Sequence, residues 1–369
     1  MHMVSFFGGL FAKKGESVIG IDIGSSSVKV VQLKKRGGRA VLETYGALAL
    51  GPYANLEIGR ATRLPIEKVM EALRDILREA KTTTVNAGVA IPFASSLMTL
   101  IEMPLVGPRE LAQMIPIEAR KYIPVPITEV TLDWSIIPRN EEVPLGEERT
   151  SPNPQKTDVL LVAIHNDILL NYQDIVTKVK IDASFFEIEI FSTMRSVLDQ
   201  EVLPVLIFDM GAASTKLYII ERGAVRVSHT INRGSQDLTL ALARSLAMSV
   251  AAAEELKRSI NLEDPKADTQ AKSVIVSSLE YVFSEANRVI LNYQRKYNKA
   301  LSKIVLVGGG SALKGLRKIA QDNFKADTVA GDPFSKVETP AFLSQMLKTT
   351  GPEFTVALGL ALRKLQESD

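Results

Sequence analysis

The sequence predicts an α/β protein with two related lobes that face each other across a cleft. Three observations predict this fold class. Residues 18–33 (VIGIDIGSSSVKVVQL) and 205–220 (VLIFDMGAASTKLYII) align without a gap. In residues 303–320, an apolar run ends in three glycines and a helical pattern follows. The chain has 369 residues, of which 46% are hydrophobic, so it exceeds one ordinary domain and can build a core in each lobe.

Each half of the repeat predicts a strand, a tight turn and a second strand, because β-branched and apolar residues flank a glycine. The offset of the alignment is 187 residues, so Lys29 matches Lys216. Backbone amides and serine hydroxyls in such turns form a concave set of donors for phosphate oxygens. The predicted phosphate-binding residues are Gly24, Ser25, Ser26, Ser27 and Lys29 in the first turn and Gly211, Ala212 and Ser214 in the second.

An aspartate ends the first strand of each half, and the two residues are Asp22 and Asp209. Direct contact between a carboxylate and a phosphate is repulsive, so the role that suits these residues is holding Mg²⁺ through its retained waters. One aspartate on each side of the cleft is what a metal bridging the β- and γ-phosphates needs. The sequence therefore predicts Asp22 and Asp209 as metal-binding residues.

Glycines also mark the second lobe. Gly308, Gly309 and Gly310 follow an apolar strand and let the backbone approach a ligand closely, while the next helix adds a partial positive charge. The spacing matches neither a P-loop nor a dinucleotide-binding fingerprint, which argues against both of those folds. Gly234 and Ser235 begin a further helix and are predicted to face the nucleotide.

Apolar patterns predict the remaining elements of the first lobe. A strand is expected near 40–49, and a helix at 65–81 begins at Pro65 and has its apolar residues on one face. Strands are expected at about 85–91 and 96–102. An inserted subdomain then follows, with a charged, proline-rich surface loop at 138–157. Its elements are helices at about 109–121 and 166–179 and strands at about 129–137 and 158–164.

The second half continues this organisation. Residues 186–198 predict a helix that leads back to the first lobe, and helices are expected at 249–262 and 273–298. The predicted segments are a tail at 1–15, the first lobe at 16–107, the inserted subdomain at 108–184, a connecting helix at 185–204, the second lobe at 205–350 and a C-terminal helix at 351–369 that packs back on the first lobe.

Taken in this order, the two phosphate turns and the glycine-rich loop resemble the actin, Hsp70 and sugar-kinase superfamily of ATP-binding proteins over nearly the whole chain. Within it, the chain is similar to the PilM family, the cytoplasmic actin-like proteins of type IV pilus assembly, which are related to the cell-division protein FtsA. The segments that carry this resemblance are GIDIGSSSVKVVQL, EMPLVGPRELAQMIPIEARKYIPVPITEVTLDW at 102–134 and GPEFTVALGLALRKL at 351–365.

The resemblance implies an actin-like (ribonuclease H-like) two-lobed ATPase fold with an FtsA-type inserted subdomain in the first lobe, and it implies ATP and Mg²⁺ as cofactors. The group that orients the attacking water matches Glu189, with Glu187 as the competing candidate. Glu254 matches an acid that binds ribose hydroxyls, and Lys257 matches a base beside adenine. The residues alone also allow exposed acids at 187 and 189 and solvated helix residues at 254 and 257.

The resemblance also implies a function, an ATP-binding adaptor that grips the cytoplasmic N-terminal peptide of a PilN-like bitopic membrane protein. Slow Mg-dependent ATP hydrolysis, contacts with other pilus platform or motor components and homo-oligomers stay open. The expected location is the inner face of the cytoplasmic membrane, reached through the partner. The alternatives are a small-molecule kinase of the same superfamily and an FtsA-like polymerising cytoskeletal protein.

Composition argues against several other classes of protein and site. The net charge is +2 with bases and acids interspersed, so nucleic acid is not an expected partner, and the absence of cysteine excludes disulfides and thiolate metal sites. No apolar stretch approaches the ~20 residues that span a bilayer. Residues 1–15 allow two interpretations, an interfacial membrane contact or a tail that frays or packs on the first lobe. The chain lacks the membrane-targeting C-terminal helix of FtsA, which favours the PilM family.

Overall fold

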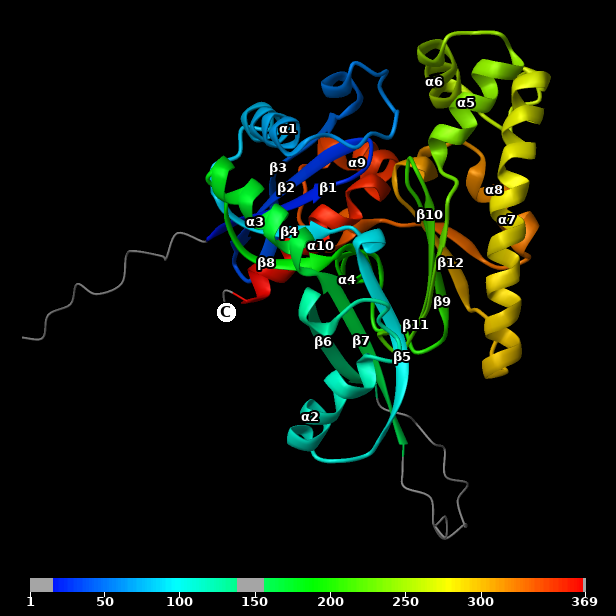
Figure 1. The fold of residues 1–369 in the computed structure, drawn as a ribbon. Helices are drawn as coiled ribbons and strands as arrows, with labels where there is room; N and C mark the ends of the chain where they lie inside the picture. The colour runs from blue at the N-terminus through cyan, green and yellow to red at the C-terminus, as the bar shows by residue number, and fades with distance from the viewer. Residues whose placement is uncertain (1–15, 138–155, 368–369) are drawn as a thin grey trace, which may run out of the picture.

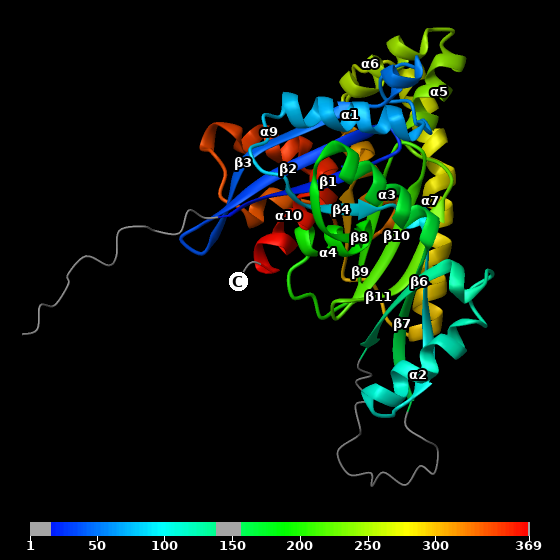
Figure 2. The same ribbon diagram turned by 60° about the vertical axis from the view of Figure 1, so that its left-hand side comes forward.

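The computed structural model describes residues 16–137 and 156–367, which form two lobes and a smaller third sheet (Figures 1 and 2). The predicted tail at 1–15 and most of the predicted loop at 138–157 lie outside the described residues. Each lobe is built on a five-stranded mixed sheet. No helix in the described ranges is both long and apolar enough to cross a membrane.

The first-lobe sheet has the strand order β3-β2-β1-β4-β8. β1 pairs antiparallel with β2 and parallel with β4, so a hairpin occupies one side and parallel strands the other. Successive residues of β1 serve opposite faces: Ile19 packs with helices α1 and α3, and Val18 packs with α10. The elements are β1 (Ser17–Ile23), β2 (Ser27–Arg36), β3 (Arg39–Ala49), α1 (Ile66–Glu79), β4 (Asn86–Ile91), α3 (Asn166–Val179), β8 (Asp182–Ile188), α4 (Glu189–Val197) and α10 (Thr355–Glu367).

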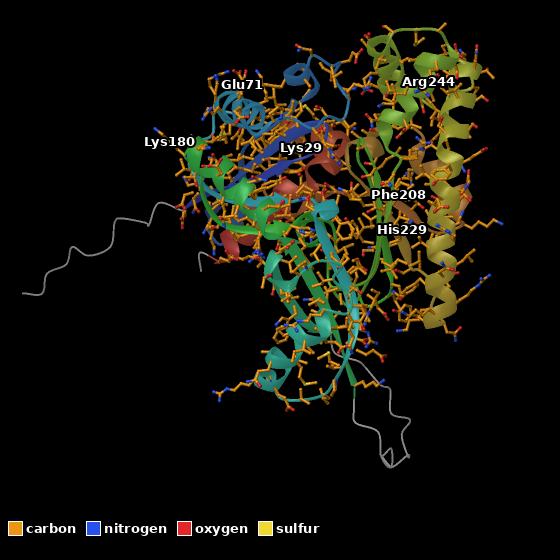
Figure 3. The ribbon with its side chains drawn as sticks, in the orientation of Figure 1. Lys29, Glu71, Lys180, Phe208, His229 and Arg244 are labelled. Carbon is orange, nitrogen blue, oxygen red and sulfur yellow. The ribbon has the colours of Figure 1, made fainter. Side chains whose placement is uncertain are left out.

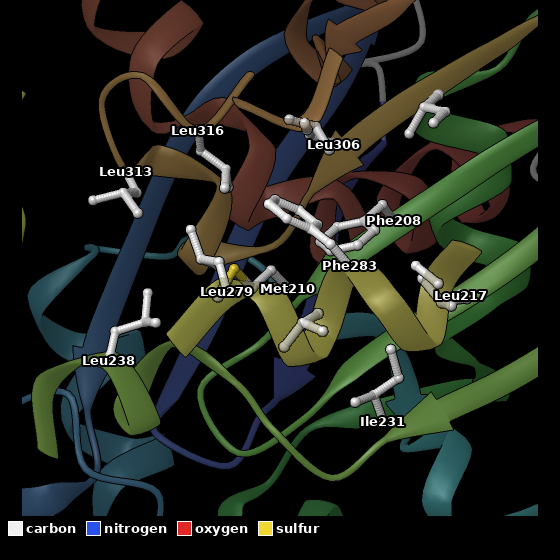
Figure 4. Close-up of a cluster of buried hydrophobic side chains, with 14 of the residues drawn as sticks. Phe208, Met210, Leu217, Ile231, Leu238, Leu279, Phe283, Leu306, Leu313 and Leu316 are labelled. Carbon is white, nitrogen blue, oxygen red and sulfur yellow. The ribbon is translucent and has the colours of Figure 1, made fainter. Parts of the chain in front are cut away.

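The second-lobe sheet repeats this arrangement with the order β11-β10-β9-β12-β13. Its hairpin strands are antiparallel, and β12 pairs parallel with β9 and β13. The long helix α7 covers one face, where Phe208 and Phe283 join a large apolar cluster (Figure 4). The elements are β9 (Val205–Met210), β10 (Thr215–Glu221), β11 (Ala224–Ile231), α5 (Ser235–Ser245), α6 (Val250–Ser259), α7 (Thr269–Tyr297), β12 (Lys303–Val307), α8 (Leu316–Phe324) and β13 (Thr328–Ala330).

The inserted subdomain is a three-stranded antiparallel sheet covered by one helix, and its composition differs from the expected 108–184. β5 (Ser96–Pro104), which we expected in the first lobe, pairs along its length with β7 (Lys156–His165). β7 pairs in turn with β6 (Val130–Ile137), and α2 (Pro108–Ala119) packs on this sheet. The alternation of apolar residues predicts a strand but not its partner, which explains the difference.

Two further boundaries follow from packing. Helix α3 contacts α1, and β8 extends the first-lobe sheet, so residues 166–188 join the first lobe. Residues 185–188 are accordingly the end of a strand, and the expected connecting helix begins only at Glu189. Phe334 and Leu347 also pack with first-lobe residues. We therefore propose 93–165 for the inserted subdomain and 205–330 for the second lobe.

The C-terminal helix α10 lies against the first-lobe sheet and against α4 (Figure 1). Two glycines permit this close approach. A Cβ on Gly20 would lie 1.7 Å from the carbonyl oxygen of Ala357, and one on Gly359 would lie 1.9 Å from that of Ser192. Any larger residue at either position would push the helix away from the sheet or from α4.

Candidate functional site

A cavity of about 1170 Å³ separates the two lobes, and the turns of both hairpins open into it. Figure 3 shows Lys29 on the first-lobe hairpin and Phe208 on the second-lobe sheet. The residues that the sequence predicts for phosphate, nucleotide and metal binding all line the cavity, with the exception of Gly234. Of the two predicted acids, Glu189 lines it and Glu187 does not. The structure thus gathers residues from both halves of the chain around one space.

The two hairpin turns have the same geometry. The Gly24 N–H donates to the Ser27 carbonyl oxygen at 3.0 Å, and the Gly211 N–H donates to the Ser214 carbonyl oxygen at 3.0 Å. The sequence repeat is therefore also a structural repeat, and the serine-containing turn lies at the same place in each lobe. The residues paired at the strand ends are Asp22 with Lys29 and Asp209 with Lys216.

Five charged side chains meet where the hairpins converge. Lys29 Nζ lies 3.7 Å from an Asp22 carboxylate oxygen, and Lys216 Nζ lies 3.8 Å from one of Asp209. Lys216 is closer to Glu189, at 2.7 Å from its Oε1. The sum is three carboxylates against two ammonium groups, so the site has an excess of negative charge.

This excess and the burial of the site change the acidity of the aspartates. The pKa of Asp209 is raised to about 6, chiefly by burial and also by the charges of Glu189 and Asp22, with Lys216 opposing them. Burial also raises the pKa of Asp22, against the opposing charge of Lys29. For Lys216 burial alone would lower the pKa, but Glu189 and Asp209 hold it above its usual value. A cation at this point would reduce the electrostatic repulsion between the carboxylates of Asp22, Asp209 and Glu189.

The donor set suits a hydrated cation. In residues 16–137 and 156–367, no group of three or more His, Cys, Asp or Glu side chains is close enough to hold a metal directly. Asp22 and Asp209 instead face each other from opposite lobes with buried, mutually repelling charges. Carboxylate oxygens that accept from metal-bound waters are a common way to hold Mg²⁺, which keeps several waters.

Glu189 connects three parts of the molecule. It is the first residue of α4, and one carboxylate oxygen accepts the backbone N–H of Phe93 at 2.7 Å. The same carboxylate pairs with Lys216 of the second lobe. Phe93 begins the inserted subdomain, so a first-lobe acid in the cavity holds both the second lobe and the insert.

Glu187 has a structural environment instead. Its carboxylate accepts from Arg195 at 2.8 Å and from Arg363 on α10 at 2.7 Å, and it also bonds the Ser192 hydroxyl. Burial alone would raise the pKa of Glu187, but the two guanidinium groups and the hydroxyl hold it below its usual value. This residue therefore fastens β8 to α4 and α10, and we leave it out of the candidate site.

The glycine-rich loop lies directly behind the second hairpin. Gly308 has φ +83°, and a Cβ there would lie 2.3 Å from an Asp209 carboxylate oxygen and 2.7 Å from the Met210 carbonyl oxygen. The Gly308 N–H donates to the Pro352 carbonyl oxygen at 2.8 Å. Only glycine fits this position, because both the backbone conformation and the space exclude a side chain. Gly309 is different, since a Cβ there meets nothing closer than 3.9 Å.

The start of α5 supports the second turn from behind. The Ser235 N–H donates to the Gly211 carbonyl oxygen at 2.9 Å, and the Gln236 N–H donates to that of Ala212 at 3.1 Å. A Cβ on Gly234 would lie 2.3 Å from the Ala212 carbonyl oxygen. Gly234 is thus a spacer that lets α5 approach the turn, which explains why it does not face the cavity.

Glu254 and Lys257 lie together on α6 at another part of the cavity wall. Lys257 Nζ is 2.7 Å from the Glu254 carboxylate, which also accepts from the Thr239 hydroxyl and from Arg258. Burial alone would raise the pKa of Glu254, but these partners hold it below its usual value. Glu254 is therefore charged and already hydrogen-bonded within the second lobe, and neither residue is an ordinary solvated helix position.

Comparison with known proteins then places the chain. A family model described as type IV pilus assembly protein PilM matches residues 20–365. The chain belongs to the PilM family. The cell division protein FtsA of Neisseria meningitidis serogroup B (strain ATCC BAA-335 / MC58) is 23% identical over an alignment of 349 positions that covers 85% of this chain and 82% of FtsA.

Solved structures show the same fold for this PilM-family chain. A chain of a PilM–PilN type IV pilus biogenesis complex superposes with a TM-score of 0.78 at 23% identity, covering 94% of this chain and 98% of that one. MreB5 of Spiroplasma citri bound to AMPPNP superposes with a TM-score of 0.52 at 12% identity, covering 95% and 97%. The predicted actin-like fold and the predicted family are both confirmed.

Among the cavity-lining residues that were absent from the predicted site, two lie beside the predicted ones and bear on the chemistry. Lys216 was visible in the alignment as the match of Lys29, and that signal was sufficient to find it. Glu353 also lines the cavity, near Gly309, and within the described part of the chain it has no hydrogen bond or ion pair. Burial raises the pKa of Glu353. It belongs to a short turn before α10, where the sequence gives no sign of a site.

Proposed function

We propose that this PilM-family chain is an ATP-binding adaptor of the type IV pilus assembly machinery. In this proposal it binds the cytoplasmic N-terminal peptide of a PilN-like membrane protein at the inner face of the cytoplasmic membrane, and ATP changes its conformation. The single observation that carries the proposal is the meeting of two equivalent serine-containing hairpin turns and a glycine-rich loop around one cavity. The AMPPNP bound to MreB5, a protein of the same fold, supports a nucleotide as the ligand.

The residues of the cavity suggest a division of labour for ATP. The turn amides and serine hydroxyls bind the phosphates from both lobes, with Lys29 and Lys216 as counter-charges. Asp22 and Asp209 would hold a hydrated Mg²⁺, and the ion would supply positive charge for the phosphates. The glycine-rich loop, Ser235 and the Glu254–Lys257 pair face the nucleoside. Glu353 is the acceptor with free lone pairs, and it suits a hydroxyl or amino group of the nucleoside.

Glu189 is the residue that we propose to orient an attacking water. It lies at a helix N-terminus in the cavity, and its carboxylate is held by Lys216 and by the Phe93 N–H. A carboxylate in that position can accept a proton from water. Because its Oε1 already accepts from both the Phe93 N–H and Lys216 in this structure, we propose that hydrolysis is slow and that ATP acts mainly as a conformational ligand.

The proposed peptide site is a second cavity, of about 680 Å³, which we call the partner groove. It is lined by β6 and β7 of the inserted subdomain, by the end of β8 and the start of α4, and by the β10–β11 turn. Phe186, Phe191 and Ile164 give it an apolar wall, and β6 is the edge strand of its sheet. The PilN component of the similar solved complex supports a PilN-like peptide as the occupant.

Calorimetric titration with a synthetic N-terminal peptide of the PilN-like protein from the same genome tests this function, with and without Mg-ATP. Ile136→Asp places a charge on β6 at a residue that lines the groove, and we expect it to weaken peptide binding by at least about tenfold. Ile117→Asp is the matched control, because Ile117 is exposed on α2 of the same subdomain and does not line the groove. Equal peptide affinity for both variants contradicts the groove, and absence of nucleotide binding contradicts the adaptor.

A small-molecule kinase is the alternative from the sequence. Such an enzyme needs an acid aimed at a substrate hydroxyl between the lobes, yet Glu187 does not line the cavity and Glu189 is held by Lys216 and Phe93. The geometry therefore favours the adaptor. ADP release stimulated by sugars or carboxylates would favour the kinase instead.

A further inference from the structure

Three separate parts of the molecule form the partner groove. The inserted subdomain contributes β6 and β7, the first lobe contributes β8 and α4, and the second lobe contributes residues 222–226 of its hairpin. The same three parts share one apolar cluster, in which Leu160 of the insert packs with Ile190 of α4 and Val225 of β11. The shape of the groove therefore depends on how the second lobe sits against the other two parts.

An ion-pair chain joins the second lobe to the insert beside this groove. Arg226 on β11 lies 3.3 Å from the carboxylate of Asp158 on β7 and 3.5 Å from that of Glu221 on β10. Glu221 is in turn held by Lys299 and by the Tyr293 hydroxyl, both of the second lobe. Arg226 is nearly buried, with 11% of its side chain exposed, so solvent screens these contacts little. Arg226 thus connects the second lobe directly to β7.

A second contact joins the nucleotide cavity to the start of the insert. The Phe93 N–H donates to Glu189, and Glu189 pairs with Lys216 in the cavity. The Phe93 ring packs edge-on against Tyr218, with 5.3 Å between centroids, and Tyr218 lies two residues after Lys216 on β10. One strand of the second lobe therefore holds a cavity lysine, touches the first residue of the insert and leads into the hairpin that carries Arg226.

From these two contacts we infer that nucleotide binding reshapes the partner groove, with Arg226 as the positioning residue that reports lobe movement to the insert. The inference rests on the proposed adaptor function and names the regulation of its groove. A ligand phosphate that draws Lys216 away from Glu189 shifts β10, and Tyr218 of that strand moves against the Phe93 ring. Because Arg226 is paired with Asp158, β7 moves with the second lobe, and the β7 residues that line the partner groove move with it. Coupling of this kind requires that nucleotide bind the two arrangements with different affinities.

Three variants of the full chain test this route. Arg226→Met removes the charge that joins the second lobe to the insert and keeps most of the side-chain stem, and Asp158→Asn removes the partner charge on the insert. Lys299→Met is the matched control, because it also takes one cation from Glu221 but touches only the second lobe. Neither Arg226 nor Asp158 lines the nucleotide cavity, so we expect calorimetric affinity for Mg-AMPPNP to stay within about twofold of wild type.

The readout is the ratio of peptide affinities with and without Mg-AMPPNP, since direct contacts of Arg226 with the peptide cancel in that ratio. We expect at least about a fivefold ratio for wild type and Lys299→Met, and less than about twofold for Arg226→Met and Asp158→Asn. Amide hydrogen exchange of β6, with and without nucleotide, gives a second readout that needs no peptide. It should respond to nucleotide in wild type and lose that response in the same two variants.

Each outcome decides a separate point. If both variants keep the wild-type ratio and exchange response, or if bound nucleotide changes neither quantity in wild type, the inference is wrong while the adaptor can stand. If the peptide does not bind wild type at all, the proposed partner is wrong, and exchange at β6 still decides the route. If Mg-AMPPNP does not bind, the proposed function and the inference both fall.

Discussion

The two hairpins that face each other across the cavity share a turn hydrogen bond and a register, yet their aspartates differ. The nearest lysine nitrogen is 3.7 Å away at Asp22 and 3.8 Å away at Asp209. Lys216, however, is shared with Glu189, and burial together with neighbouring carboxylates raises the pKa of Asp209 to about 6. The internal repeat gives the two hairpins the same backbone arrangement. Glu189, which lies outside the repeat, pairs with Lys216 and so makes the charge surroundings of the two aspartates unequal.

The segments that follow the parallel strands β4 and β12, next to the hairpins, differ even more between the two lobes. β4 and β12 hold the same place in their sheets. After β12 the chain enters the glycine-rich loop at 308–310, which lines the cavity, whereas after β4 it enters Phe93 and the inserted subdomain. Equivalent positions thus serve a ligand in one lobe and an additional subdomain in the other.

The largest expected effect comes from removing the shared lysine. Lys216→Met leaves Glu189 and Asp209 buried without their cation, and we expect a loss of about 3–5 kcal/mol of unfolding free energy. Lys29→Met breaks one ion pair, with Asp22, whereas Lys216→Met breaks two, so we expect about half that loss from Lys29→Met. Denaturant unfolding at pH 7.5 without nucleotide measures both. Equal losses for the two variants would show that the hairpins are electrostatically equivalent after all.

The glycine-rich loop gives the next effect. Gly308→Ala forces a Cβ against Asp209 and Met210 at a positive φ, so we expect destabilisation of about 3 kcal/mol and loss of nucleotide binding. Gly309→Ala is the control, because that position has room for a methyl group. Thermal unfolding and nucleotide calorimetry on the pair measure the difference. A stable Gly308→Ala protein that binds nucleotide would contradict the described packing behind the second hairpin.

A moderate gain in stability is expected when the unequal aspartate is neutralised. Because the pKa of Asp209 is raised from 3.8 to about 6, the folded state binds more protons than the unfolded state between these values. Wild-type stability attributable to this group is therefore complete below pH 4 and is lost as the pH rises through 6. We expect Asp209→Asn to exceed wild type by about 3 kcal/mol at pH 7.5 and not at pH 4.

Unfolding of both proteins across pH 4–7.5, without nucleotide, measures this gain. Asp22→Asn is the comparison, and we expect a smaller gain from it. Under the proposed function both variants lose affinity for the Mg-nucleotide, so stability and binding move in opposite directions. An Asp209→Asn protein whose advantage does not change with pH would refute the raised pKa as its cause.

The smallest expected change in stability concerns a hydroxyl group that the second hairpin has and the first hairpin lacks. Tyr218 aligns with Val31 of the first hairpin, and its buried hydroxyl has no hydrogen-bond partner among the described residues. Tyr218→Phe should therefore leave stability unchanged or raise it by up to about 1 kcal/mol. Tyr293→Phe should instead lose about 1 kcal/mol, because that hydroxyl bonds Glu221. Thermal unfolding compares the two, and a clear loss in Tyr218→Phe would reveal a partner for its hydroxyl.

Much of the fold and the cavity lining could be predicted from the sequence, because both depend on local patterns. The repeated hairpins and the strand that precedes Gly308 need only apolar alternation and glycine. The family could also be predicted, because three segments of the sequence resemble the PilM family. The roles of the lining residues stay predictions until ligand binding is measured.

Features that depend on distant contacts could not be predicted. The pairing of β5 with β7 joins residues some 60 positions apart, and no local pattern selects that partner over β4. Glu187 and Glu189 have similar sequence surroundings, yet the strand-to-helix junction points one to Arg195 and Arg363 and the other to the cavity. Glu353 is recognisable only once folding places its turn beside the glycine-rich loop.

The position of α10 bears on the order in which the chain folds during synthesis. Its residues fill one face of the first-lobe sheet, against strands translated more than 300 positions earlier. The second-lobe core, by contrast, uses residues 206–326 and is complete sooner. The lobe that is translated first is therefore finished last, and on the ribosome its open sheet face is a ready substrate for chaperones until α10 emerges.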